Sequence, residues 1–414
     1  MQKLKSYIIG LSLFFVPLFF LPVTHEFYNI NKLMLMTIAS IVLLSVSSYQ
    51  FFKSRQIRWS RNSLRVVIPI SIFFVAVSLS TAFVSINKVQ AVLNYTYGPL
   101  ILAVLTVFYW YISQEENDTT IDLMLRFSGF CISAITIVLF FHPFSAIILP
   151  KTFQFLKNQN FSPIGTRADL ILFLGFVWIY QFLYLLKIRK QTSRADWFAI
   201  LGVVVSTIAL VISFLNPASR ATSNLVQNTA PLKLSLKAAV MSLSTPAGFV
   251  IGSGINNFSS VFTRVKDGAY NASANWAVNS YDGAYSAILQ ILVESGVLSA
   301  LALIGVFISG FLLCRNKSSL ILLGYIALAF LAAPASLMLF LLLYCSLGMI
   351  ASESTKNKKQ NIHISDNKSL FLVGFINTSV LVTLTLLLLF ALVPLYRAEV
   401  EMRNSVVAIA NNSL

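Results

Sequence analysis

Long apolar runs alternate with short polar connectors along the whole chain. A helix rises about 1.5 Å per residue and bilayer hydrocarbon is about 30 Å thick, so roughly 20 apolar residues cross it. Because lipid leaves open backbone groups unsatisfied, each run is expected to be an α-helix. The pattern predicts eleven such helices, near residues 7–23, 33–52, 66–85, 98–113, 122–141, 168–186, 197–215, 287–313, 319–334, 336–351 and 369–391.

The predicted fold is therefore an all-α polytopic membrane helix bundle. Residues 1–215 hold seven of the predicted helices and residues 284–395 hold four. The longest polar segment, residues 216–283, separates the two groups, and residues 396–414 form a tail. A connector as long as 216–283 is usually functional or disordered, and its internal patterns favour a function.

Composition and charge agree with a membrane protein. Of the 414 residues, 57% are hydrophobic and 11% are charged, and the mean hydropathy is +0.79; a soluble enzyme is excluded. The net charge of +16 would suit a nucleic-acid partner, but 17 of the 30 basic residues lie in the N-terminal segment and in four alternate connectors. This follows the positive-inside rule, so the partner is a lipid bilayer and no nucleic acid is expected. The N-terminus is predicted to be cytoplasmic, and residues 216–283 and the tail external.

The apolar region around Pro334 allows two interpretations: a hairpin of two short helices, or one helix kinked at the proline. The hairpin places two basic connectors on the same side, so charge favours it. Arg126 lies one turn inside its predicted helix, and we expect its side chain to extend to the interface. Arg167 and Asp169, at the start of another helix, are expected to pair with each other.

Metal and disulfide chemistry is not indicated. The three cysteines fall in or at the ends of predicted membrane helices and are odd in number. The three histidines are scattered over separate connectors without the spacing of a ligand set. No metal and no other cofactor is expected.

The segment 216–283 contains a predicted amphipathic helix, "APLKLSLKAAVMSL", expected to lie on the outer leaflet. Its leucines and valine recur at helical spacing, while Lys233 and Lys237 lie on another face. The following "STPAGFVIGSGINNFSSVFTRVK" has Gly252 and Gly254, which allow tight turns. Its Asn256 and Asn257 either close turns or bind sugar hydroxyls.

Cations outnumber acids in this external segment, against the positive-inside trend. They are Arg220, Lys233, Lys237, Arg264 and Lys266, opposed by Asp267 and Asp282. Two explanations stay open: contact with anionic lipid heads, or a site for a phosphate-bearing substrate, to which arginine makes paired hydrogen bonds. Aromatic side chains of the segment, Tyr270, Trp276 and Tyr281, either hold sugar faces or anchor the segment at the interface.

The next predicted helix, running from Ala284 to Cys314, carries Gln290 and Glu294 on one face near its start. Such a helix would be about 46 Å long, so its first turns extend beyond the hydrocarbon. This places Glu294 at the outer interface. It serves either as an anchor that hydrogen-bonds the external segment to the helix or in catalysis.

Two stretches resemble the polytopic O-antigen ligase and polymerase group. "GSGINNF" supplies Gly252, Gly254, Asn257 and Phe258, and "LQILVESGVLS" supplies Glu294, at the spacing of that group. Arg220 in "PASRATS" looks like the arginine that ends another of its helices. The chain departs from the group at its histidine position, which is Tyr285 here, and tyrosine is a poor base at neutral pH.

The resemblance implies a glycosyltransferase in a bacterial cytoplasmic membrane. It would move a glycan from a polyprenyl-diphosphate carrier to a glycan, lipid or protein acceptor on the outer face, without metal or cofactor. Arg220 and Arg264, helped by Lys233 or Lys237, would neutralise the diphosphate; Tyr285 or Asp282 would handle the proton. Gly252, Gly254, Asn256, Asn257 and Glu294 would form the substrate side of the site.

Two alternatives fit the same pattern. A flippase or other transporter of lipid-linked glycan would need a phosphate-binding exterior but no catalytic base. The near absence of ionisable residues from the apolar centres and the lack of a convincing internal repeat favour the transferase. The third interpretation is a catalytically inactive relative, which Tyr285 would explain.

Overall fold

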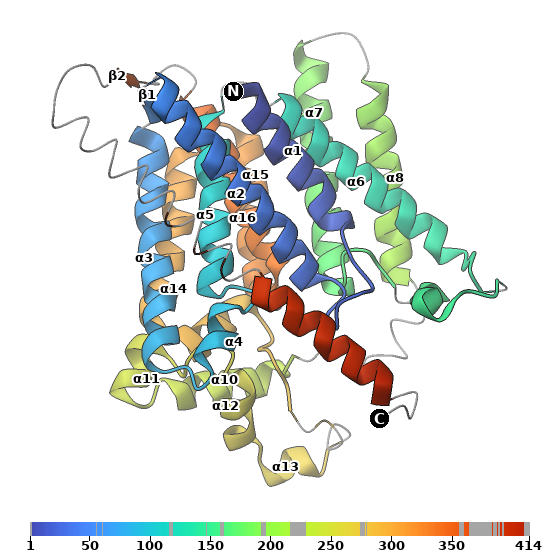
Figure 1. Cartoon of the computed structure of the whole chain (residues 1–414), viewed down its shortest axis with the longest axis vertical. Coiled ribbons are helices and arrows are strands. Elements are labelled where there is room, and N and C mark those ends of the chain that lie inside the picture. Colours follow the sequence, from blue (N-terminus) through green and yellow to red (C-terminus); the bar gives the residue numbers. More distant parts are fainter. Residues whose placement is uncertain are drawn as a thin grey trace. The chain divides into compact units, whose positions relative to one another are not determined.

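A computed structural model of the chain describes residues 2–54, 56–59, 61–115, 119–145, 147–157, 161–191, 196–215, 229–273, 278, 280–355, 360–363, 383, 387, 390 and 393–409 (Figure 1). In this part of the chain, seven helices are long and apolar enough to cross a bilayer, and two shorter apolar helices accompany them. Several apolar helices of this kind indicate a multi-pass membrane protein. Most of the span expected at 369–391 lies outside the described residues, so the total of eleven stays a prediction.

The chain divides into two compact units, and neither is one continuous stretch. Unit 1 comprises Met1–Ser63, Trp110–Asn216 and Thr355–Leu414; unit 2 comprises Leu64–Tyr109 and Pro217–Ser354. The sequence analysis set boundaries at residues 215, 283 and 395, between the groups of membrane helices and the segments expected to be external. These boundaries stay a prediction.

Unit 1 is built mainly from helices that pack side by side. Its elements are α1 (Gln2–Leu18), α2 (Asn29–Ser54), β1 (Gln56–Trp59), α6 (Thr119–Phe140), the 3-10 helix η1 (Lys151–Lys157), α7 (Arg167–Gln191), α8 (Trp197–Leu215) and β2 (Gln360–His363). The helix α1 packs on α2 and α6, and α6 also packs on α7 and α8. The strands β1 and β2 pair antiparallel, with Ile57 opposite Ile362. Residues 393–409 are helical as well.

Unit 2 joins apolar helices to a group of short ones. Its elements are α3 (Arg61–Phe83), α4 (Lys88–Val92), the first part of α5 (Pro99–Gln114), α10 (Leu232–Ser242), α11 (Pro246–Ile251), α12 (Phe258–Val265), α13 (Gly268–Asn271), α14 (Ala287–Leu313), α15 (Lys317–Ala332) and α16 (Leu337–Thr355). The short helices α10, α11 and α12 all contact α14. They gather around its N-terminal end, in yellow-green in Figure 1.

The short helices have a hydrophobic core of their own. Phe258 and Phe262 of α12 are fully buried among small residues of α10 and of the segment before α14. The Phe262 ring meets the rings of Tyr270 and Tyr281 edge to face, at centroid distances of 5.5 and 5.0 Å. The expectation that Tyr270 and Tyr281 hold sugars or anchor the segment at the interface is therefore wrong, because both rings are buried in this core; Trp276 lies outside the described residues.

The hairpin interpretation around Pro334 is confirmed. The helix α15 ends at Ala332 and α16 begins at Leu337. The carboxylate of Glu353, near the end of α16, accepts hydrogen bonds from the Asn316 amide at 2.5 Å and the Ser319 hydroxyl at 2.9 Å. These two residues lie at the start of α15, so the two helices run antiparallel.

Two expectations about buried charge are wrong. Arg126 does not extend to the interface: its guanidinium stays buried, 2.8 Å from Asp122 and 3.6 Å from Asp196, and lies over the Tyr184 ring. Paired carboxylates and a ring face compensate the charge, so it need not reach water. Arg167 donates to the carbonyl of Ser213, while Asp169 accepts from the hydroxyl of Thr166 at 2.7 Å.

Candidate functional site at the broken helix

The helix α14 is broken at Gly296, which corrects the expectation of one continuous helix. Gly296 has φ 75° and ψ −174°, outside the helical region. A break of this kind leaves the preceding carbonyl groups without their usual helical partners. The carbonyl of Val293 accepts from the backbone N–H of Ser253 at 2.9 Å, and that of Glu294 accepts from the N–H of Gly254 at 2.9 Å. The segment 252–257, which we call the glycine loop, therefore docks on the break.

Serine hydroxyls complete the docking. Ser242 at the end of α10 and Ser253 of the glycine loop both donate to the Val293 carbonyl, at 2.7 and 2.8 Å. Ser80 of α3 donates to the Glu294 carbonyl at 2.7 Å. The carbonyl oxygens of Val293 and Glu294, which the break frees from the helix, thus accept hydrogen bonds from neighbouring elements, as buried polar groups require.

We call the contact between the glycine loop and the break in α14 the joint. Its glycines are needed because the two backbones approach closely and because their backbone angles suit glycine. Gly252 and Gly254 have φ of 73° and 95°. A Cβ atom on Gly252 would lie 2.5 Å from the Glu294 carbonyl oxygen, and one on Gly296 would lie 2.5 Å from the Val250 oxygen. No side chain fits at these positions, so the glycine loop and the broken helix contact each other backbone to backbone.

The carboxylate of Glu294 lies at the centre of the joint and has no exposed surface. Its Oε1 accepts from the backbone N–H of Phe258 at 3.1 Å, and its Oε2 accepts from the hydroxyl of Tyr97. Phe258 is the first residue of α12, whose N-cap residue, Asn257, makes no side-chain capping bond. Glu294 therefore caps α12 from another helix, where a negative charge is favoured.

Side chains before α5 support this carboxylate. Tyr97 is fully buried, and its ring stacks on Phe340 at 5.7 Å. Burial, and then the adjacent Glu294 charge, raise the pKa of Tyr97 well above its usual value, so its hydroxyl stays a donor. Asn94 donates from its amide to the side-chain oxygen of Asn256 at 3.2 Å and accepts from the backbone N–H of Tyr97 at 3.3 Å.

The structure brings together part of the set of residues predicted from the sequence. Five residues of that set meet at the joint: Gly252, Gly254, Asn256, Asn257 and Glu294. The amide of Asn257 donates to the Ser253 carbonyl at 2.8 Å, so it closes a turn. The anchor interpretation of Glu294 is confirmed by its bond to Phe258, and its full burial keeps it from touching a substrate in this conformation.

Most of the charged and polar side chains predicted to act in the transfer reaction lie on the surface of unit 2. The side chains of Arg264, Lys233, Lys237, Asp282 and Tyr285 are exposed. The backbone N–H of Tyr285 donates to the hydroxyl of Ser235 at 2.9 Å, which fixes the tyrosine beside α10. Arg220 lies outside the described residues, so its place in the set stays a prediction.

One of these cations has a carboxylate partner. The ammonium group of Lys237 lies 2.6 Å from Asp267. The hydrogen bond from Lys237, followed by one from the backbone of Tyr270, lowers the pKa of Asp267 below its usual value. Asp267 also caps α13 through the N–H of Tyr270 at 2.9 Å.

The outer face of α10 bears a hollow of about 680 Å³. Its lining is mostly aliphatic and includes two lysines; the residues are Leu232, Lys233, Leu236, Lys237, Val240, Met241, Ser244 and Val265. Leu232, Leu236 and Val240 are exposed, as the predicted amphipathic helix requires. We call this surface the α10 face.

Sequence reasoning missed Tyr97, Asn94 and Ser80. The stretch "NYTYGP" before α5 is polar between two apolar runs, which signals a turn and gives no indication of its distant partner.

Within the described residues, no group of three or more His, Cys, Asp or Glu side chains is placed to hold a metal ion. Comparison with models of known protein families found no match, and a search of curated proteins found no relative.

Proposed function

We propose that this chain is a membrane glycosyltransferase that moves a glycan from a polyprenyl-diphosphate carrier to an acceptor hydroxyl at the outer face of a bacterial cytoplasmic membrane. The observation that carries the proposal is the α10 face. Its exposed aliphatic side chains suit an isoprenoid tail, and Lys233 among its lining residues suits the attached phosphates. A lipid-linked diphosphate combines these two chemistries in one molecule.

The cations of unit 2 would act on the leaving group. As the bond between the sugar carbon and the phosphate oxygen breaks, the diphosphate leaves with the electron pair and gains negative charge. Exposed Arg264 and Lys233 would stabilise that charge, and Arg220 would join them. Lys237 would contribute less, because Asp267 already neutralises much of its charge.

The acceptor would attack the sugar carbon through a hydroxyl oxygen whose proton must leave. Exposed Asp282 and Tyr285 flank Gly283 and Ala284 just before α14. Carboxylates commonly act as general bases, so Asp282 is the proposed proton acceptor. Tyr285 would then position the acceptor.

The joint around Glu294 would hold these groups in place. It fixes the start of α12, whose last turn bears Arg264, to the helix that follows Tyr285. Positioning of this kind lowers a barrier without the positioning residue touching substrate.

The test uses purified protein in liposomes with a polyprenyl-diphosphate glycan and a candidate acceptor. Arg264→Ala should lower the rate of transfer by about 10²-fold, whereas Lys266→Ala, a nearby cation placed over the Tyr270 ring at 5.0 Å, should leave it within about twofold. The proposal fails if wild-type protein forms no product with any acceptor class, or if Arg264→Ala has full activity.

A transporter of lipid-linked glycan is the second candidate, favoured by the break in α14. Broken helices near substrate sites are typical of transporters, where freed backbone groups face the ligand. Here the glycine loop occupies those groups, which weighs toward the transferase. In the same liposomes, movement of the lipid-linked glycan between leaflets without product would support the transporter, and neither activity would support an inactive relative.

A further inference from the structure

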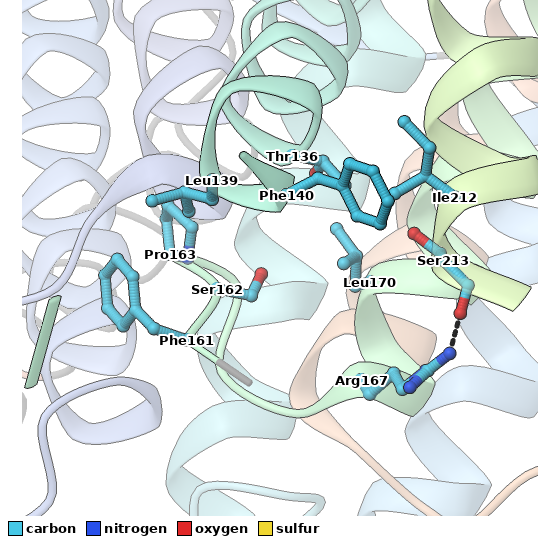
Figure 2. Close-up of a pocket in the computed structure, with 10 residues that line it drawn as sticks. All are labelled: Thr136, Leu139, Phe140, Phe161, Ser162, Pro163, Arg167, Leu170, Ile212 and Ser213. Carbon is cyan, nitrogen blue, oxygen red and sulfur yellow. Dashed lines mark hydrogen bonds between the residues drawn. The ribbon is translucent and has the colours of Figure 1, made fainter. Parts of the chain in front are cut away.

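A small cavity lies in unit 1, and none of its lining residues takes part in the proposed transfer reaction. The ends of α6 and α8, the start of α7 and the segment 161–163 line it, it is partly open, and its volume is about 60 Å³ (Figure 2). Aliphatic and aromatic side chains form most of the wall. Four lining residues have polar side chains: Thr136, Ser162, Arg167 and Ser213. The Thr136 hydroxyl already donates to the Ile132 carbonyl at 2.8 Å, so the other three provide the polar groups of the argument.

Arg167 contributes a cation with unused donors. It is the first residue of α7 and donates one N–H to the carbonyl of Ser213. A guanidinium has five N–H donors, and this is its one hydrogen bond recorded among the described residues. Arg126 shows the contrast, since two carboxylates and a tyrosine ring surround it.

Ser213 contributes a buried hydroxyl that has no hydrogen-bond partner among the described residues. The residue is 5% exposed. Two other buried serines of unit 1 bond to their own helix: Ser133 donates to the Gly129 carbonyl at 2.7 Å and Ser206 to the Val203 carbonyl at 3.1 Å. The Ser213 hydroxyl instead points toward the side of the cavity lined by Phe140 and Leu170 (Figure 2). An unpaired buried hydroxyl is destabilising, and a ligand that bonds to it would remove that cost.

Ser162 adds a donor on the opposite wall. Its oxygen accepts the backbone N–H of Ile164 at 3.3 Å, so its own proton remains to donate. The segment that carries Ser162 is held by Lys32, whose buried ammonium donates to the carbonyls of Pro163 and Ile164. The cavity wall is therefore fixed in place.

The nearest acid on α7 does not compete for the cavity. Asp169 is buried, accepts from the Thr166 hydroxyl at 2.7 Å and lies close enough to Lys32 for their charges to interact. A cation and two hydroxyl groups thus line the cavity. All three favour a negative ligand that accepts hydrogen bonds.

We infer that this cavity binds a phosphate group, either as inorganic phosphate or as the headgroup of a phosphate monoester lipid. A single water needs about 10–15 Å³, so a cavity of about 60 Å³ has room for one tetrahedral oxyanion. Arginine makes paired hydrogen bonds to phosphate oxygens. This inference is independent of the proposed transferase and concerns other residues.

The test measures binding by calorimetry on the full chain in maltoside micelles, which contain no phosphate. The probes are inorganic phosphate, dioctanoyl phosphatidic acid and, as a phosphate-free control, dioctanoylglycerol. Arg167→Gln should weaken phosphate-probe binding by about tenfold or more, and Ser213→Ala severalfold, because each removes a donor. Ser206→Ala is the matched control on the same helix and should bind like wild type, since its hydroxyl already has a partner.

Binding of both phosphate probes with these variant effects supports a general phosphate site; binding of phosphatidic acid alone supports a lipid headgroup site. The inference is overturned if neither phosphate probe binds, if dioctanoylglycerol binds as well as phosphatidic acid, or if Ser213→Ala binds like wild type. Ser213→Ala removes a hydroxyl without a partner, so it should stay folded even if Arg167→Gln does not.

Discussion

At the scale of single residues, the buried carboxylate of Glu294 is the group on which most of the site depends. It accepts from Phe258 on one oxygen and from Tyr97 on the other. Loss of one partner of a buried hydrogen bond leaves the other unsatisfied, which costs more than the bond itself is worth. The residue thus joins three elements, α12, α14 and the turn before α5.

Glu294→Ala should lower the free energy of unfolding by about 2–4 kcal/mol, because it strands the Phe258 N–H and the Tyr97 hydroxyl. Glu294→Gln should cost clearly less, since its amide oxygen still accepts one of the two bonds. Thermal unfolding in detergent measures both. Equal stability of wild type and Glu294→Ala would contradict the assignment of a joint.

Tyr97 gives the joint a dependence on alkaline pH. Because the folded state raises the pKa of Tyr97, the folded chain keeps this proton at a pH where the unfolded chain loses it. The stabilisation is present below pH 10 and falls as pH rises above 10. The unfolding midpoint should therefore drop more steeply above pH 10 in wild type than in Tyr97→Phe; parallel pH profiles would show that Tyr97 does not contribute.

At the scale of elements, the broken helix and the glycine loop are complementary. The break exposes two carbonyls, and the loop supplies the N–H groups that satisfy them. The contact is backbone to backbone, so it tolerates no side chain at Gly252 or Gly296.

Gly252→Ala and Gly296→Ala should each destabilise the protein strongly, by about 2 kcal/mol or more, through steric overlap and unfavourable backbone angles. Gly324→Ala in α15 is the matched control: a Cβ there meets nothing within 4 Å, and alanine favours helices. Its unfolding midpoint should equal or exceed that of wild type. If all three variants have the same unfolding midpoint, the close approach at the break does not contribute to stability.

The same elements show what the sequence could and could not predict. Among the residues that the structure describes, nine apolar helices occur where the hydropathy pattern predicted spans, because length and apolarity are local properties. The anchor interpretation of Glu294 followed from its place at the start of an apolar run. The break at Gly296 and the partner Tyr97 depend on contacts over long sequence distances, as does the burial of Tyr270 and Tyr281 in a core. No local pattern specifies such contacts.

At the scale of the whole molecule, helices from both sides of the segment 229–283 belong to unit 2. The α3 and α5 region and the α14 to α16 region both contact that segment or its joint. Unit 2 therefore contains the joint, the α10 face and the exposed cations together, which is the arrangement that the proposed transfer reaction needs.

The most direct test of the proposed function is the side of the membrane that α10 to α13 face, because the proposed donor is consumed on the outer side. Gly268 has open space around its backbone, so Gly268→Cys in a chain lacking Cys131, Cys314 and Cys345 provides a label site. An impermeant maleimide should react with this cysteine in intact cells. Reaction only after the membrane is opened would place the segment in the cytoplasm and contradict the proposed function.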